Sequence, residues 1–265
     1  MKKLLLLPLM AAVLSSCSSK IFYQVYKTES TTVTSKTDNA MAYEDDRCRV
    51  EYNLWADEGE AGFTFYNKTD EVLKLRLDES FYVLNAIAHD YYGHRVFEDS
   101  RNTVVTATSN FGYGRFGWIS MYGATGIASG NASSVSVTEA PILAIPPKTA
   151  KHVSEYKINQ VLYRDCDLFR FPSARKVTTK NFTATASPLQ FYNLIIYTLG
   201  TSETRQSVKN DFAVTAITNY PQKVVLKRIN NEFCGEKEFS QGFMVGDGSP
   251  DKFYLKYVKV EGIKH

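Results

Sequence analysis

Residues 50–67 read VEYNLWADEGEAGFTFYN, and this stretch indicates the fold class. Apolar side chains alternate with polar ones through Val50–Leu54, and the alternation returns in Gly62–Asn67. Between these runs lies the acidic, glycine-containing segment Asp57–Glu60. Alternation with a period of two is typical of half-buried strands, and a short polar link between two such runs predicts a β-hairpin.

Strand signals of the same kind continue along the chain. Leu73, Leu75 and Leu77 alternate with polar residues, and Phe81–Ala88 is a more continuous apolar run that predicts one strand buried on both faces. Further strands are predicted at Pro141–Pro147, Lys151–Ile158, Phe191–Leu199, Phe212–Ile217, Val224–Ile229 and Phe253–Val260, and a short helix or turn at Asp165–Ser173. Strands at this spacing, without long helical periods, predict a mainly β protein with an antiparallel β-sandwich, immunoglobulin-like or related.

Composition supports strands and limits the partners. The 265 residues include 17 Tyr and 16 Phe, and aromatic residues make up 13% of the chain. The formal net charge is +3. A nucleic-acid-binding protein usually carries a clear basic excess, so we expect no nucleic-acid partner.

The N-terminus has the order of a bacterial export signal. Met1–Lys3 is basic, and the apolar run Leu4–Leu14 is shorter than the roughly 20 residues that a spanning helix needs. The following Leu14-Ser15-Ser16-Cys17 resembles the lipobox of bacterial lipoproteins. The resemblance implies that residues 1–16 are a removed signal peptide and that Cys17 carries lipid. An ordinary secretory signal followed by a stray cysteine is the alternative.

The residues after Cys17 bear on location and domain layout. The next residues, Ser18-Ser19-Lys20, include no acid, and by analogy with lipoprotein sorting this favours the periplasmic face of the outer membrane. The Ser/Thr-rich residues 17–42 are expected to form a tether, in which Ile21–Tyr26 is either a strand added to the body or an aromatic contact near the membrane. The body would then be 43–265, as one unit or as two subdomains of about 43–158 and 159–265.

Two blocks carry a second resemblance. Residues 43–92 (YEDDRCRVEYNLWADEGEAGFTFYNKTDEVLKLRLDESFYVLNAIAHDYY) and 140–158 (APILAIPPKTAKHVSEYKI) are similar to a group of Bacteroides-type outer-membrane lipoproteins. This resemblance implies a β-rich lipoprotein with a Gly/Ser-rich segment of variable length between the blocks. It implies no activity and no site residues.

The mature chain would keep Cys48, Cys166 and Cys234 in addition to Cys17. An oxidising envelope allows one disulfide among these three, with the pairing open, and at least one thiol must stay unpaired. A buried thiol that acts as a small hydrophobe is the alternative for each.

The insertion 102–138 contains a glycine motif, formed by Gly112, Gly114 and Gly117 in the G-x-G-x-x-G spacing. A dinucleotide site also needs a helix after the motif, whereas residues 120–137 are rich in Gly and Ser and contain no Leu, Glu or Lys. We therefore expect no cofactor.

The same insertion is neutral and aromatic, with Arg115 as its one charged residue. Such a composition favours a loop that contacts an envelope protein or a glycan, and a loop that packs its own aromatics is the alternative. The candidate contact residues are Phe111, Tyr113, Arg115, Phe116, Trp118 and Tyr122.

Other chemical signals are weak. The spacing of His89 and His94 is a poor zinc spacing, and Ser154-x-x-Lys157 lacks its companion motifs. The acids of Asp57–Glu60 are expected to be solvated turn residues. We therefore expect no metal, no catalytic residue and a non-enzymatic, lipid-anchored binding or structural module. The rivals are an envelope hydrolase that uses surface carboxylates or Ser154, and a subunit of an outer-membrane assembly formed by strand exchange at Ile21–Tyr26.

Overall fold

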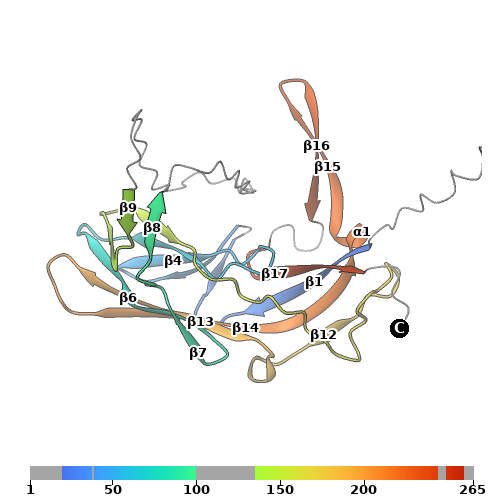
Figure 1. The fold of residues 1–265 in the computed structure, drawn as a ribbon, viewed down its shortest axis with the longest axis horizontal. Helices are drawn as coiled ribbons and strands as arrows, with labels where there is room; N and C mark the ends of the chain where they lie inside the picture. The colour runs from blue at the N-terminus through green and yellow to red at the C-terminus, as the bar shows by residue number, and fades with distance from the viewer. Residues whose placement is uncertain (1–19, 38, 100–134, 244–248, 260–265) are drawn as a thin grey trace, which may run out of the picture.

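The structure is a computed structural model that describes residues 20–37, 39–99, 135–243 and 249–259 (Figure 1). These residues form a mainly β, antiparallel fold, as predicted, with an eight-stranded curled sheet and a five-stranded sheet. The large sheet contains β1 (Lys20–Glu29), β6 (Leu73–Leu84), β7 (Ile87–Asp90), β10 (Ile142–Ile145), β12 (Thr179–Asn181), β13 (Gln190–Leu199), β14 (Gln206–Pro221) and β17 (Lys252–Lys259). The small sheet contains β2 (Ser35–Lys36), β3 (Met41–Glu44), β4 (Cys48–Tyr52), β5 (Phe63–Asn67) and β11 (Ala150–Val153).

Two hairpins and two short helices complete the described part. The hairpins are β8 (Val96–Asp99) with β9 (Val135–Thr138), and β15 (Leu226–Phe233) with β16 (Glu236–Phe243); the helices are η1 (Ala184–Ala186) and α1 (Gln222–Val225). Among the described residues, no helix has the length and apolar character needed to cross a bilayer.

The predicted hairpin in residues 50–67 is confirmed. β4 and β5 pair antiparallel, with Val50 opposite Phe65. The inward side chains of both strands are buried, while the intervening ones are less so. The connection includes Gly59 at a φ of +75°, a left-handed conformation that favours glycine, and a side chain there would also collide with Ile158.

The two sheets share one buried core. The ring of Tyr52 on β4 lies 5.0 Å from that of Phe212 on β14, and Phe65 on β5 lies 5.4 Å from Tyr197 on β13. The hydroxyl of Tyr52 also donates to Oδ1 of Asn210 across the core, at 2.8 Å. Strands from both sides of residue 158 contribute to the large sheet, because β6 pairs directly with β13.

The prediction of one strand over Phe81–Ala88 is wrong. β6 ends at Leu84 and β7 returns from Ile87, so the run is a hairpin. Asn85 and Ala86 form the turn, with φ of +46° and +68°. Positive φ at both central residues is the geometry of the two-residue turns that match strand twist, and Asn tolerates it well. The apolar Ile87 is consequently 64% exposed.

The segment expected to be a tether contains a central strand. β1 lies between β14 and β17 and is hydrogen bonded to both. Tyr23, Val25 and Tyr26 are buried, which explains why this part of a Ser/Thr-rich region is ordered as strand rather than linker. The strand alternative at Ile21–Tyr26 is therefore confirmed.

Several strands differ from their predicted bounds. β11 ends at Val153, short of the predicted Ile158. β14 continues past Ile217 to Pro221, because Thr218 and Asn219 still pair with β1. The predicted strand Val224–Ile229 begins instead with the turn of α1, and β15 starts at Leu226. Residues 165–173 contain turns, as one of the two alternatives for that segment proposed.

Candidate functional site

The insertion emerges from a short hairpin, in which β8 pairs with β9 and Val96 lies opposite Thr138. The six candidate contact residues, the three motif glycines and Cys17 all lie outside the described residues. What the structure describes is the base from which the insertion leaves the body.

That base is held by an ion-pair cluster. The guanidinium of Arg95 pairs with Glu139 and with Glu155, donating to Oε2 of Glu155 at 2.9 Å. Glu139 also accepts from the backbone N–H groups of Gly93 and Arg95, at 3.0 and 3.2 Å. Its pKa is lowered, chiefly by the hydrogen bond from the Arg95 side chain. Residues on both sides of the insertion are thereby fixed to each other.

The structure gives Cys48, Cys166 and Cys234 as free thiols. Cys48 is buried beside Asp45, while Cys166 and Cys234 are exposed. Burial raises the pKa of the Cys48 thiol to about 12, which makes it a small apolar core residue rather than a nucleophile.

The acidic clusters have structural contacts. Asp45 accepts from the backbone N–H groups of Arg47 and Cys48, at 2.8 and 2.7 Å; burial raises its pKa, but these hydrogen bonds outweigh it, so the pKa is lowered. Asp57 accepts from the backbone of β17, Glu58 from Gln160, and Glu60 from the backbone of Gly62, as well as pairing with Lys157. These carboxylates organise loops.

The histidines are packed separately. His89 lies among the rings of Tyr82 and Tyr156, His94 lies against Tyr92, and the Nδ1 atom of His152 is 3.1 Å from Oγ1 of Thr64. Across the described ranges, no group of three or more potential ligands is placed to hold a metal ion.

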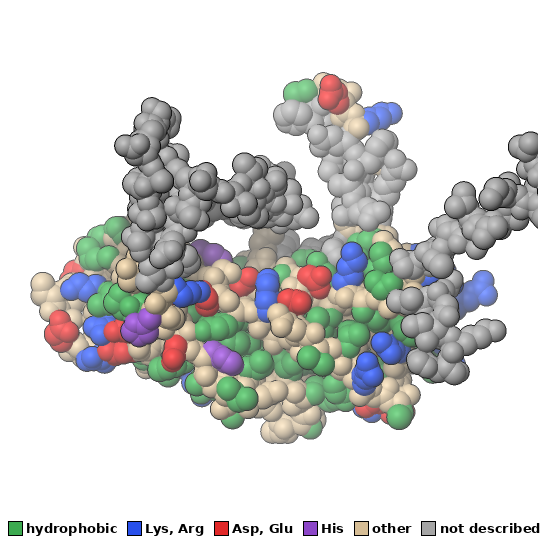
Figure 2. Space-filling view, viewed as in Figure 1, with side chains coloured by type: hydrophobic (Ala, Val, Ile, Leu, Met, Phe, Trp, Pro, Cys, Tyr) green, Lys and Arg blue, Asp and Glu red, His purple; other side chains and the backbone are tan. Residues whose placement is uncertain are grey.

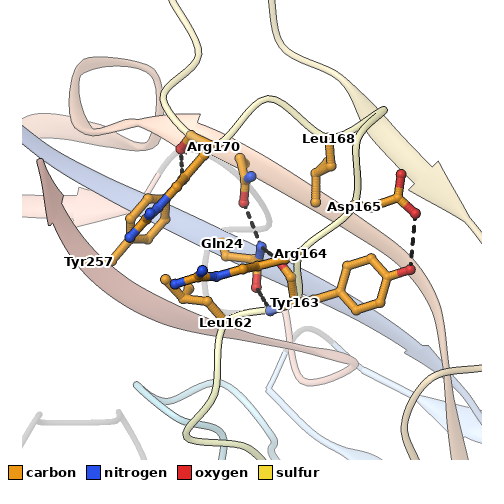
Figure 3. Close-up of a pocket in the computed structure, with 9 residues that line it drawn as sticks. Gln24, Leu162, Tyr163, Arg164, Asp165, Leu168, Arg170 and Tyr257 are labelled. Carbon is orange, nitrogen blue, oxygen red and sulfur yellow. Dashed lines mark hydrogen bonds between the residues drawn. The ribbon is translucent and has the colours of Figure 1, made fainter. Parts of the chain in front are cut away.

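A cavity of about 180 Å³ lies against the large sheet, under the segment 159–178 (Figure 3). Gln24 and Tyr257 line its floor from β1 and β17, and Asn219 lines it from β14. Its other walls come from the covering segment, namely Leu162, Tyr163, Arg164, Asp165, Leu168 and Arg170.

Gln24 fixes the covering segment to the sheet. Its side chain is 1% exposed, and its Nε2 donates to the carbonyl of Tyr163 at 3.0 Å and to Oδ1 of Asn219 at 2.8 Å. Its Oε1 accepts from the backbone N–H of Tyr163 at 2.7 Å and from the hydroxyl of Tyr26. Every polar atom of this buried amide is therefore used, as burial requires.

Two arginines and one aspartate line the cavity, and the aspartate is already paired. Asp165 accepts from the Tyr163 hydroxyl at 3.2 Å and pairs with Lys180 at 3.3 Å. Arg164 and Arg170 extend toward the Tyr257 side, away from Asp165 (Figure 3). Within the described residues neither guanidinium pairs with a carboxylate. Such a site can attract an anionic group.

Sequence reasoning did not single out this site. A signal for it is present in residues 168–176, LFRFPSARK, where basic residues alternate with aromatic ones. The floor of the cavity comes from strands that are far apart along the chain, so the pocket itself has no local signature.

Comparisons of the chain with protein-family models, with curated proteins and with solved structures found no match. Function must therefore be argued from the geometry and the sequence signals.

Proposed function

We propose that the protein is a cell-envelope lipoprotein, anchored by lipid on Cys17, whose β body is a non-enzymatic binding or structural module. The observation that carries the proposal is that β1 begins at Lys20, three residues after the lipobox cysteine, and lies inside the large sheet. The anchor and the folded body would be joined almost directly. The expected setting is the periplasmic face of the outer membrane, and the expected architecture is a sandwich related to the immunoglobulin type.

The insertion 102–138 is proposed to contact an envelope protein or a glycan. In Figure 1, β8 and β9 stand at the end of the body opposite to the start of β1. A body anchored near Lys20 would present the insertion away from the bilayer. The Arg95–Glu139 pair supports this role, because it holds the two ends of the insertion together.

The rival functions receive less support from the geometry. The acids considered for a hydrolase are engaged in loop contacts. Strand exchange at β1 would require β14 or β17 to leave, since both edges of β1 are hydrogen bonded.

The test is deletion of Asn110–Ser133 from the lipoprotein in its native envelope, followed by cross-linking and affinity capture. The hairpin β8–β9 and the Arg95 cluster stay intact in this variant, so the body should keep its thermal unfolding profile. Loss of a partner that wild type captures supports the contact role. An unchanged set of partners in a folded variant would refute it.

A further inference from the structure

The segment 159–178 is packed firmly on the face formed by β1 and β17. The ring of Phe171 lies 5.2 Å from that of Phe22 and 6.1 Å from that of Tyr257. The hydroxyl of Tyr257 donates to the carbonyl of Arg170 at 2.5 Å. The segment therefore offers a fixed outer surface rather than a loose loop.

This outer surface combines cations with aromatic rings. The guanidinium of Arg170 lies 5.0 Å from the centre of the Phe171 ring, and Nζ of Lys259 lies 5.4 Å from it. Nζ of Lys176 lies 4.3 Å from the centre of the Phe169 ring. We call these residues, together with Arg164, the basic-aromatic patch; its members are Arg164, Phe169, Arg170, Phe171, Lys176 and Lys259.

The patch keeps its positive charge. Within the described residues, its four cations form no ion pair, whereas the nearby acids Asp165 and Asp167 both pair with Lys180. Apolar surface accompanies the charge, because Phe169 is 39% exposed. Exposed aromatic residues beside Lys and Arg are typical of surfaces that lie in a lipid headgroup region.

The patch lies at the end of the body where the anchor would attach. Lys20 is directly opposite Lys259 in the β1–β17 pairing, and Phe22 is opposite Tyr257. Figure 2 shows several Lys and Arg side chains at this end of the molecule. From Cys17 to Lys20 the chain spans at most about 11 Å, so a lipid on Cys17 would hold this end close to the headgroups.

We propose that the basic-aromatic patch docks on anionic phospholipid headgroups and so orients the body on the membrane. The inference rests on the proposed lipid anchor for its biological setting, but the patch is defined by the described residues alone. Charge complementarity favours an anionic surface, and the two arginines beside the cavity are placed to pair with headgroup phosphates. Docking here places β8 and β9, from which the insertion leaves the body, at the end opposite the membrane contact.

The test measures binding of the mature chain from residue 17, carrying Cys17→Ser so that no lipid is attached, to sedimented vesicles. We expect binding to phosphatidylglycerol-containing vesicles, weakening with added salt, and little binding to pure phosphatidylcholine. Each Lys or Arg near an anionic surface strengthens binding about fivefold. Replacing three patch cations by Gln (R164Q, R170Q, K259Q) should therefore weaken binding by about 100-fold.

A matched control removes the same charge elsewhere, at Lys74, Lys148 and Lys209, also by replacement with Gln. This control should weaken binding far less than the patch variant. Equal losses in the two variants, or equal binding to both vesicle types, would overturn the proposal. Thermal unfolding of both variants shows whether each is folded. If one is not, dye labels on Cys166 and Cys234 test membrane docking in a chain that keeps all of these cations.

Two exposed thiols give the second readout. An environment-sensitive dye on Cys166, with Cys234→Ser, reports on the patch segment, and a dye on Cys234, with Cys166→Ser, reports on the tip of the β15–β16 hairpin. Anionic vesicles should blue-shift the emission at position 166 and leave position 234 unchanged. A shift only at 234 would overturn the proposal. Because this chain carries no lipid, failure here is distinct from failure to find lipid on Cys17.

Discussion

Replacing Gln24 by Leu should destabilise the protein by about 3 kcal/mol, because the side chain is buried and all its polar atoms are used. Leu has a similar volume, so the change tests hydrogen bonding more than packing. The carbonyl of Tyr163 and Oδ1 of Asn219 lose the donor that Gln24 supplies. A buried polar group left without a partner costs about 1–3 kcal/mol, and two such groups give the predicted loss.

The assay is urea unfolding followed by tryptophan fluorescence, with a matched control in Gln160→Leu. Gln160 is exposed and makes one long hydrogen bond to Glu58, so its replacement should change stability by less than about 0.5 kcal/mol. With a urea slope of about 3 kcal/mol per molar, Gln24→Leu should lower the midpoint by about 1 M. Equal midpoints for the two variants would refute the view that Gln24 fixes segment 159–178 to the sheet.

Three further predictions use other described residues. Tyr52→Phe should lower the free energy of unfolding in urea by about 1 kcal/mol, because the Tyr52 hydroxyl donates to Asn210. Tyr82→Phe should be nearly neutral, because the buried Tyr82 hydroxyl has no partner among the described residues. Equal losses of stability in the two variants would contradict the reasoning. In the Cys17→Ser chain at pH 8, maleimide should modify Cys166 and Cys234 but not the buried Cys48, as read by mass spectrometry; a third adduct under native conditions would contradict the burial of Cys48. The pKa of Glu139 is lowered, so its stabilising contribution is present above its unfolded pKa of about 4.3 and is lost as pH falls through the lower folded pKa. Hydrogen exchange at β8–β9 should therefore accelerate in that acidic range. Glu139→Gln should remove this pH-dependent step.

Much of the strand content could be predicted because alternation is a local property. The runs at 50–67 and 191–199 have buried inward faces, and that pattern is visible without knowledge of the neighbours. The Asn85–Ala86 turn was missed because an apolar run conceals it, and the only cue is the tolerance of Asn for positive φ. A continuous apolar stretch does not distinguish a buried strand from a tight hairpin.

Position within a sheet is a different matter, because it depends on distant partners. A strand at Ile21–Tyr26 was one of two alternatives from the sequence, and its place between β14 and β17 depends on residues about 190 to 240 positions away. The cavity has the same origin, since Gln24, Asn219 and Tyr257 meet only after the sheet has formed. The contact residues proposed in the insertion lie outside the described part of the chain and stay a prediction.

The most direct test of the proposed anchor is the mass of the N-terminal peptide of the protein purified from its own membranes. The account predicts a mature chain that begins at Cys17 and carries acyl groups on that residue, and a Cys17→Ala variant that is not acylated and leaves the membrane fraction. A mature chain that begins elsewhere, or an unmodified Cys17, would contradict the central claim.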